Sequence, residues 1–469
     1  MRVTVVGLGA VGLVTAACLA AEGHDIVGLE ADPDRLAALR RGEVPFHEPG
    51  LDELTATSLA ERRLVLSDSP DAAVSTARLV ILAVGTHGPD GSWQSASMVR
   101  CLLEVVPLVA DDAVLVIRST LPPDFAVGIA ARVAGLRRAT GRPDVPVLLN
   151  PEFTREGTAV HDFQHPSRIV IGIASDPSGS GLAAVKRLYA HTTAPLRVVS
   201  AMDACLGKLA ANLFLGTRIS FANELAAVCE EYGADIEAVV DTMAPDPRIG
   251  SYFFRAGLGF GGSCLPSQVA MMSRAVREHG LSTPLLDAVT AINARQIERF
   301  ADRLTAFLGD LAGARICLLG LAFKPGTDDL RDAPSLNLAR RLIAAGAAVV
   351  AYDPMPRARS GAAAQVAGLQ VADSAAQAIA GADAIGLVTE WAEFAALDWE
   401  GLQASLARPI IIDGRNALDA GRLIGAGYAY AGFGRADRAV PAGVADKAGT
   451  VGHDSKVEPV LALAMGRVE

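Results

Sequence analysis

The chain has 469 residues, of which 51% are hydrophobic and only 5% aromatic, and its formal net charge is −10 at pH 7. This length predicts about three domains of roughly 150 residues each, and no uncharged apolar run reaches the roughly 18 residues that a membrane span requires. Because nucleic acids and anionic membrane surfaces are themselves negatively charged, we expect neither as a partner.

Six cysteines are scattered along the chain without the spacing of metal ligands, and five of them fall in apolar, periodic segments. This usage is typical of a reducing compartment rather than of a disulfide-bonded secreted protein. The N-terminus begins on a strand pattern, without the apolar core and cleavage site of a secretory signal. We therefore expect a cytoplasmic protein with no metal site.

The start of the chain has the pattern of a strand, a glycine-rich turn, a helix and a second strand. The turn is a G-x-G-x-x-G motif that follows Val3–Val6, and Glu30 stands at the end of the second strand. Such glycines let the backbone approach a pyrophosphate at the helix N-terminus, and the carboxylate accepts hydrogen bonds from the adenosine ribose. Because a carboxylate repels a 2′-phosphate, the pattern favours NAD over NADP. The expected NAD contacts are Gly7, Gly9, Ala10, Val11, Gly12 and Glu30, and Arg35 is either a further ribose or phosphate contact or a solvated helix residue.

Two further apolar strands, expected at Leu79–Val84 and Val114–Ile117, each lead into a hydroxyl side chain. Thr86 follows the first strand and Thr120 the second. In open α/β sheets, ligands lie outside the carboxyl ends of the strands. We therefore expect both threonines to contact cofactor or substrate, with helix capping or turn formation as the alternative.

A strand expected at Val147–Leu149 leads into the run Asn-Pro-Glu-Phe-Thr-Arg-Glu-Gly at residues 150–157. Two glutamates and an arginine directly after a buried strand indicate a site loop rather than a surface turn. Glu152 can act as a general base there if burial raises its pKa. A strand at Arg168–Gly172 and a helix at Leu182–His191 follow, and the first domain is expected to end near residue 200.

One long helix is predicted from Asp203 to about Tyr232, too long and too apolar to be solvated on all sides. Lys208 and Asn212 are four residues apart and therefore share one face. A lysine within an apolar stripe either extends its amine to solvent or meets an anion. A helix of this length between two domains is also a natural dimer interface, with a purely intramolecular role as the alternative.

The run Gly-Leu-Gly-Phe-Gly-Gly-Ser-Cys-Leu-Pro at residues 257–266 is the most unusual stretch of the chain. Each glycine loses much conformational entropy on folding and buries no side chain, so a run of glycines does not suit a core helix or strand. The run indicates a loop pressed close to a ligand. Cys264 is then either a nucleophile presented at a rigid turn or a buried structural cysteine. Helices are expected from about Val269 to Leu308.

Residues 315–353 repeat the strand, turn and helix pattern of the N-terminus, and the turn now carries an aromatic and two basic residues: Phe323, Lys324 and Arg331. Such a turn suits a base and phosphates. Further strands are expected at Ala384–Thr389 and Ile410–Asp413. The predicted fold class is α/β, with two Rossmann-like doubly wound domains joined by a long central helix.

With these motifs in this order, the chain resembles the UDP-glucose/GDP-mannose dehydrogenase family, most closely its UDP-glucose 6-dehydrogenase branch, from residue 1 to about 435. The motifs that carry the resemblance are Gly7–Gly12, residues 150–157, Lys208 with Asn212, Arg248-Ile249-Gly250, Gly259–Cys264, Gly320–Arg331 and Asp413–Asn416. The resemblance implies an NAD-binding domain at 1–200, a central helical and dimerisation region with the cysteine loop at 201–308 and a nucleotide-sugar-binding domain at 309–435. From about Ala436 the composition turns to Ala, Gly, Pro and charged residues, so we expect a flexible tail at 436–469.

The resemblance also implies an activity, the oxidation of the C6 alcohol of UDP-glucose to the carboxylate of UDP-glucuronate with two NAD. Cys264 would form a thiohemiacetal and then a thioester, Lys208 and Asn212 would stabilise the oxyanion, and Glu152 would act as base with a water near Thr120. The implied substrate contacts are Phe153, Thr154, Lys208, Asn212, Arg248, Tyr252, Gly261, Phe323, Lys324 and Arg415, and the further cofactor contacts are Thr86, Thr120, Glu156 and Arg331. Arg248 would reach the substrate of a neighbouring subunit, which implies a homodimer or a larger homo-oligomer.

The chain departs from the family pattern directly after the cysteine, where Ser267 and Gln268 replace Lys and Asp. Gln268 can donate and accept hydrogen bonds but cannot take up a proton, so this departure bears on thioester hydrolysis. His87 likewise stands where proline is usual. Two other functions therefore remain open: a relative that oxidises another nucleotide sugar or stops after two electrons, and a catalytically impaired nucleotide-sugar-binding homologue.

Overall fold

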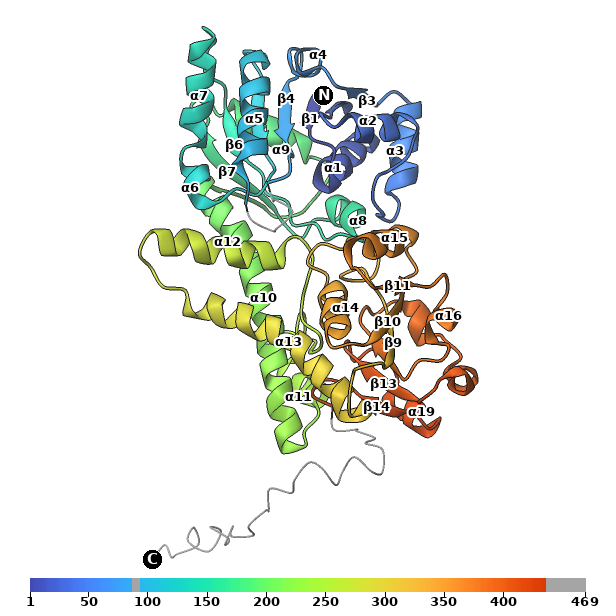
Figure 1. Cartoon of the computed structure of the whole chain (residues 1–469). Helices are drawn as coiled ribbons and strands as arrows, with labels where there is room; N and C mark the ends of the chain where they lie inside the picture. Colours follow the sequence, from blue (N-terminus) through green and yellow to red (C-terminus); the bar gives the residue numbers. More distant parts are fainter. Residues whose placement is uncertain (87–92, 436–469) are drawn as a thin grey trace, which may run out of the picture.

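Two β-sheets, each covered by helices, form an N-terminal and a C-terminal domain that one long helix connects (Figure 1). The computed structural model describes residues 1–86 and 93–435. The expectations for His87 and for a tail at 436–469 lie outside the described residues. The two-domain α/β architecture that the sequence predicts is confirmed, including the long central helix.

The N-terminal sheet has eight described strands in the order β3-β2-β1-β4-β5-β6-β7-β8, and β7 runs antiparallel to β6. The strands are β1 (Arg2–Val6), β2 (Asp25–Leu29), β3 (Leu64–Ser67), β4 (Leu79–Leu82), β5 (Val114–Ile117), β6 (Val147–Leu149), β7 (Ile169–Ser175) and β8 (Leu196–Ser200). The central strands β4, β5 and β6 are buried along their whole length, because helices cover both faces of a parallel sheet. The edge strands β3 and β8 are short and partly exposed, and arginines stand directly before β3 and within β8, so the sequence did not predict them.

Two apolar cores lie on the two faces of this sheet. Leu13 and Leu19 of α1 belong to one core, and Met98 of α5 and Val133 of α7 belong to the other. The helices of this domain are α1 (Ala10–Ala21), α2 (Pro33–Arg40), α3 (Leu51–Ala60), α4 (Pro70–Val74), α5 (Ser95–Val105), the 3-10 helix η1 (Val106–Leu108), α6 (Pro123–Val127), α7 (Ile129–Ala139), α8 (Ala159–Gln164) and α9 (Ser180–Leu188).

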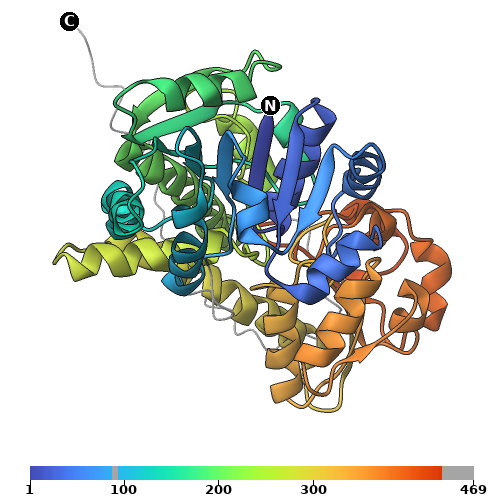
Figure 2. The ribbon, with the colours of Figure 1, turned by 90° about the horizontal axis from the view of Figure 1, so that it is seen from above.

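The central region is built on α10 (Ala201–Tyr232), which confirms the long helix predicted from the sequence. The Ser200 hydroxyl caps its N-terminus by accepting the N–H of Asp203 at 3.1 Å, and Gly233, at φ 68°, ends it. The helices expected from Val269 to Leu308 are two, α12 (Leu265–Glu278) and α13 (Pro284–Leu308), and α11 (Ile236–Met243) precedes them. Seen from above, α12 projects to one side, away from the C-terminal domain (Figure 2).

The C-terminal sheet has six described strands, all parallel, in the order β11-β10-β9-β12-β13-β14. This is the Rossmann strand order. The strands are β9 (Arg315–Leu319), β10 (Ala348–Tyr352), β11 (Gln370–Val371), β12 (Ala384–Leu387), β13 (Ile410–Asp413) and β14 (Ala429–Ala431), and the helices are α14 (Pro334–Ala344), α15 (Pro356–Gln365), α16 (Ala375–Ile379), α17 (Ala392–Ala395), α18 (Trp399–Leu402), the 3-10 helix η2 (Gln403–Ser405) and α19 (Ala420–Gly425).

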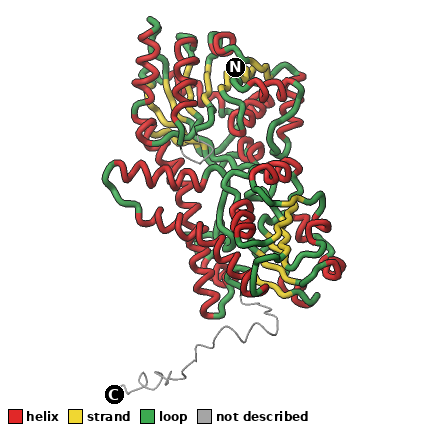
Figure 3. The backbone as a smooth tube through the Cα atoms, in the orientation of Figure 1, coloured by secondary structure: helices red, strands yellow, loops and turns green. Residues whose placement is uncertain are grey.

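The two Rossmann domains meet through loops that leave the carboxyl ends of their strands (Figure 3). Arg331 of the C-terminal domain contacts Glu156 of the N-terminal domain at 3.0 Å. The backbones also approach closely, because a Cβ added at Gly157 would lie 2.9 Å from the carbonyl oxygen of Gly326. Since ligands of such sheets bind outside the carboxyl ends of the strands, the interface between the domains is the expected place for a site.

Candidate active site

The glycine motif between β1 and α1 has the geometry of a dinucleotide site. A Cβ added at Gly12 would lie 1.8 Å from the carbonyl oxygen of Gly7, so the start of α1 packs directly on the turn. At Gly9, which precedes Ala10 and Val11, a Cβ would meet none of the described residues within 4 Å. The N-terminus of α1 therefore faces open space that suits a pyrophosphate, and the residues present fit NAD.

Glu30 ends β2 beside this turn and is buried. Its carboxylate accepts the N–H of Leu8 at 2.8 Å and the N–H of Asp32 at 2.9 Å, which holds it at the tip of the strand. Arg35 donates to the same carboxylate at 3.2 Å. Arg35, for which the sequence left two roles open, is thus an ion-pair partner of Glu30 at the expected ribose position.

Thr86 and Thr120 lie together at the ends of neighbouring strands. The Thr86 hydroxyl donates to the carbonyl oxygen of Thr120 at 3.0 Å, so Thr86 also has a structural contact of its own. Thr120 lines a small cavity together with Lys208, Pro151 and Cys205. The structure therefore brings Thr120 next to the lysine of α10.

Glu152 and Lys208 form a buried ion pair. Lys208 Nζ donates to Glu152 Oε1 at 3.1 Å, and the backbone and hydroxyl of Thr154 donate to Glu152 Oε2 at 2.7 and 2.6 Å. Burial pushes the pKa of Glu152 upward, but Lys208, Thr154 and Arg118 outweigh it, so the pKa lies below its usual value. The sequence analysis made the role of Glu152 as a base depend on a pKa raised by burial, and that condition is wrong. Glu152 is ionised at neutral pH.

Cys264 lies at the N-terminus of α12 and is the exposed member of six free cysteines, the other five being buried. Its thiol is 3.6 Å from the hydroxyl of Ser263. The surrounding protein raises the pKa of Cys264, and Glu152 raises it further, whereas Lys208 and Ser263 lower it. The alternative of a buried structural cysteine does not hold for Cys264, because solvent reaches its side chain.

Asn212 lies one turn after Lys208 on α10 and contacts the segment that follows the cysteine. Its side-chain amide donates to the side-chain oxygen of Gln268 at 2.9 Å, and Gln268 is buried. The residue that departs from the family pattern is thus the hydrogen-bond partner of Asn212. Lys208 and Asn212 are oriented by two different elements, the loop after β6 and α12.

The glycine run before the cysteine is pressed against protein. A Cβ at Gly257 would lie 2.2 Å from the Gly414 carbonyl oxygen, and one at Gly261 would lie 2.3 Å from that of Asp332. The sequence-based explanation, close approach to a ligand, is therefore corrected at these positions: the glycines let the loop lie against the C-terminal domain. At Gly262, a Cβ would be 2.7 Å from the ring of Phe323, one of the expected substrate contacts.

Glu156 meets a second carboxylate at the domain interface. Arg331 Nη2 bridges them, at 3.0 Å from Glu156 Oε1 and 2.7 Å from Asp329 Oδ2. Burial and the charge of Asp329 raise the pKa of Glu156 to about 7, although Arg331 opposes them. Arg331 bonds keep the pKa of Asp329 low despite its burial. Glu156 Oε1 is also 3.5 Å from the Ser263 hydroxyl, so this cluster adjoins Cys264.

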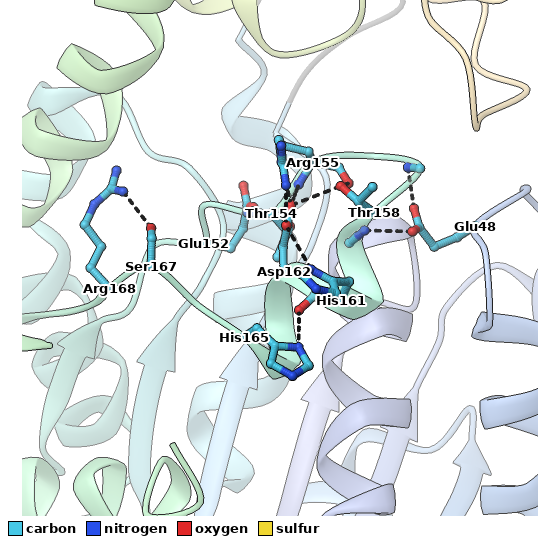
Figure 4. A network of polar contacts seen from close by, with 12 residues as sticks. Glu48, Glu152, Thr154, Arg155, Thr158, His161, Asp162, His165, Ser167 and Arg168 are labelled. Carbon is cyan, nitrogen blue, oxygen red and sulfur yellow. Dashed lines mark hydrogen bonds and ion pairs between the residues drawn. The ribbon is translucent and has the colours of Figure 1, made fainter. Parts of the chain in front are cut away.

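Two more of the expected substrate contacts lie in this region. Lys324 Nζ stands 5.3 Å from the centre of the Phe323 ring, and burial lowers its pKa while Glu156 raises it. The Phe153 ring lies between two cations, with the Arg168 guanidinium at 3.8 Å and Lys208 Nζ at 5.3 Å. The loop that carries Phe153 is seen in Figure 4.

Three expected substrate contacts lie elsewhere or have other partners. Arg248 and Tyr252 are exposed, and Arg248 pairs with Asp246 in its own loop. The Arg415 guanidinium donates to the carbonyl oxygens of Val388 and Gly259 at 2.6 and 2.7 Å. Arg415 thereby ties the C-terminal domain to the glycine run.

Sequence reasoning missed Asp329, Glu48 and Arg118. Asp329 stands two residues before Arg331 in a loop that was already singled out, and that spacing is the signal that could have found it. The buried Arg118 donates to Asn150 and Tyr189 at 2.9 Å each. Glu48 has no local signal, because its partners lie more than a hundred residues away.

The part of the chain that the structure describes has neither a metal cluster nor a membrane-spanning helix. In the described residues, no group of three or more His, Cys, Asp or Glu side chains is arranged to hold a metal ion. Nor is any helix of residues 1–86 or 93–435 long and apolar enough to cross a membrane.

Comparison with known proteins agrees with this geometry. Models of the UDP-glucose/GDP-mannose dehydrogenase family match along the chain: the NAD binding domain at residues 1–193, the central domain at 202–295 and the UDP binding domain at 317–420. A UDP-glucose 6-dehydrogenase of Pseudomonas aeruginosa is 40% identical over 446 residues, covering 93% of this chain and 98% of the relative. One of Haloferax volcanii is 38% identical over 427 residues, covering 89% and 97%.

Solved structures are similar over the same extent. A UDP-glucose dehydrogenase of Pyrobaculum islandicum has a TM-score of 0.81 and 33% identity, covering 89% of this chain and 94% of that protein. A UDP-D-ManNAc dehydrogenase of Pyrococcus horikoshii also has a TM-score of 0.81, with 27% identity, covering 93% and 100%. The chain therefore belongs to the UDP-glucose/GDP-mannose dehydrogenase family and is an NAD-dependent oxidoreductase.

Proposed function

We propose that the chain oxidises the C6 alcohol of UDP-glucose to a carboxylate and forms UDP-glucuronate. The observation that carries the proposal is one exposed thiol, Cys264, whose pKa responds to both members of the buried Lys208–Glu152 pair. The loop that carries Glu152 adjoins the C-terminal domain, because Glu156 of that loop pairs with Arg331 at 3.0 Å. This arrangement brings a nucleophile, a cation and a base to the interface of a dinucleotide domain and a UDP domain.

In the first oxidation, the chain binds the sugar and receives the proton of its C6 hydroxyl. Glu152 is ionised at neutral pH and therefore accepts a proton, directly or through a water near Thr120. Lys208 stabilises the developing oxyanion as a charged hydrogen-bond donor. NAD, when bound, accepts one hydride in each of the two oxidations.

The second oxidation requires the thiol. An aldehyde carbon delivers a hydride only after a nucleophile has made it tetrahedral, and Cys264 would add to it as a thiohemiacetal. Asn212, held by Gln268, and Lys208 would stabilise the oxygen of this adduct. Loss of the second hydride leaves a thioester on Cys264, and Glu152 would activate the water that hydrolyses it.

The experiment that tests this function is the number of NADH formed per UDP-glucose consumed, run to completion with the purified protein. We expect two NADH per sugar and UDP-glucuronate as product. Cys264→Ser should abolish uronate formation, because no thioester can form. One NADH per sugar, or an unchanged rate in Cys264→Ser, would instead indicate an oxidation that stops at the aldehyde.

Two alternatives have specific observations in their favour. Gln268 in place of the family acid favours an enzyme whose thioester hydrolysis is slow, which a burst of NADH and a stable adduct on Cys264 would reveal. The similarity to a UDP-D-ManNAc dehydrogenase favours another UDP sugar. No NADH with UDP-glucose but two NADH with another UDP sugar would support that substrate. Binding without turnover of either sugar would support the impaired homologue.

We also propose that two copies of the chain pair along α10, in the cytoplasm. Phe214, Phe221 and Val228 are 60%, 48% and 46% exposed and recur every seven residues, so they form one apolar face of the helix. Such a face on a single chain favours a second copy as its partner. Exposed Arg248 would then be available to the neighbouring subunit. Five buried free thiols are consistent with a reducing compartment.

A further inference from the structure

Glu48 is a buried carboxylate that the reaction described above does not use. It lies in the loop between α2 and α3 and is 3% exposed. Its Oε2 accepts the N–H of Gly157 at 2.6 Å and its Oε1 accepts the N–H of Ala159 at 2.7 Å (Figure 4). A buried charge needs such bonds, and bonds from N–H groups to a carboxylate are stronger than neutral ones. Glu48 is therefore bound to the loop that carries the catalytic base.

That loop is held from the other side by the C-terminal domain. Gly157 has a φ of 82°, and a Cβ there would lie 2.9 Å from the carbonyl oxygen of Gly326. Its neighbour Glu156 pairs with Arg331 at 3.0 Å. The end of the loop is thus enclosed between Glu48 and the loop of the nucleotide domain.

The residues just before Glu48 contact the same domain. The N–H of His47 donates to Asp328 Oδ1 at 3.0 Å, and Arg357 Nη1 donates to the carbonyl oxygen of Val44 at 2.9 Å. Asp328 belongs to the loop that also carries Lys324 and Arg331. We call residues Val44–Glu48 the strap, because this one segment contacts the nucleotide loop through its backbone and the substrate loop through the Glu48 side chain.

We propose that Glu48 is a positioning residue of the oxidation, whose carboxylate fixes the loop of Glu152 and Glu156 and links its position to docking of the C-terminal domain. The inference rests on the proposed function, since Glu152 is the base of that reaction. Both oxygens of Glu48 accept backbone N–H groups of the substrate loop, so its contacts are those of a residue that positions the loop. Its effect is to reduce the freedom of the loop, and such positioning affects the rate of the chemical step.

The test compares Glu48→Gln with wild type in the full chain. Glutamine has nearly the same volume, but its NH₂ group must face one of the two N–H donors, so one bond is lost. We expect kcat to fall by about tenfold or more, while KM for NAD changes by less than about threefold, because the glycine turn is untouched. The matched control is Glu43→Gln, an exposed residue directly before the strap, which should keep wild-type kcat.

A second readout does not depend on turnover. In hydrogen exchange, the amides of Gly157 and Ala159 should exchange faster in Glu48→Gln, while the amides of β1 stay as in wild type. Glu48→Gln can also be combined with Asp328→Asn. The double variant should lose less activity than the sum of the losses in the two single variants, because both substitutions act through the strap.

Three results would overturn the inference: wild-type kcat in Glu48→Gln, unchanged exchange at Gly157 and Ala159, or faster exchange over the whole N-terminal domain with equal losses in kcat and NAD affinity. The last result would mean a purely structural role. If wild type makes no NADH from any UDP sugar, the proposed function fails, and the exchange experiment still decides whether Glu48 holds the loop.

Discussion

Cys264 and the Lys208–Glu152 pair act on one another electrostatically. Desolvation by the surrounding protein and the negative charge of Glu152 raise the pKa of the Cys264 thiol, although solvent reaches the side chain, and the positive charge of Lys208 lowers it. Since the thiolate is the nucleophile, the thiol of the free protein is poorly reactive at neutral pH. In the proposed mechanism, we therefore expect Cys264 to lose its proton in the step in which the substrate aldehyde is present.

Alkylation of Cys264 by iodoacetamide tests this arrangement. In wild type the rate should rise with pH toward the raised pKa of the thiol. Glu152→Gln should lower that pKa and speed alkylation at pH 8, and Lys208→Met should slow it. Intact mass gives the extent of reaction, because the other five cysteines are buried. Cys264→Ser is the control, and a slower reaction in Glu152→Gln would contradict the assignment.

At the scale of the element, helix α10 has two different faces. One face carries Lys208 and Asn212 toward the loop after β6 and toward α12. The other exposes Phe214, Phe221 and Val228. If Lys208 and Asn212 are the oxyanion donors and a second copy covers the apolar face, as we propose, α10 joins catalysis to assembly.

Phe221→Asp tests the pairing along α10. Placing a charge in the middle of the apolar face should convert the dimer to a monomer in light scattering after size-exclusion chromatography, because an unpaired buried charge is strongly unfavourable. The matched control is Leu103→Asp on α5, where the side chain is 56% exposed, and the dimer should persist. A wild-type protein that is already monomeric would refute the pairing.

At the scale of the whole molecule, the domains meet at a cluster of charges. We call the arrangement in which Arg331 contacts Glu156 across the two domains the closed form. In this form, burial and the charge of Asp329 raise the pKa of Glu156 from 4.5 to about 7. If the domains separate, Glu156 becomes solvated and its pKa returns toward 4.5. The closed form therefore binds more protons between these pH values, so it is favoured at low pH and loses that advantage as pH rises to about 7.

Small-angle X-ray scattering between pH 5 and 8 checks this dependence. We expect the ratio of closed to open molecules to fall as pH rises, by at most about tenfold per pH unit for one proton, and to level off above pH 7. Glu156→Gln cannot titrate and should lack this component. The same pH dependence in wild type and in Glu156→Gln would contradict the role of Glu156.

Much of the fold could be read from the sequence, because its signals are local. Such local signals are the glycine turn, the apolar runs of β4 and β5, and the helical pattern that continues along the whole of α10. The edge strands β3 and β8 were missed because they are short and half-exposed, and arginines stand directly before β3 and within β8. Element type follows from short-range patterns, and strand pairing at a sheet edge does not.

By itself, the sequence determined the family and the NAD-binding turn, and it singled out Cys264 as the cysteine expected to act as nucleophile. Only the tertiary structure decided that the pKa of Glu152 is lowered, that the glycines before Cys264 lie against the C-terminal domain, and that Glu48 holds the substrate loop. The physical reason is common to all three. The pKa of a buried group and the space around a glycine depend on atoms that the fold brings close, and those atoms belong to residues far away in the chain.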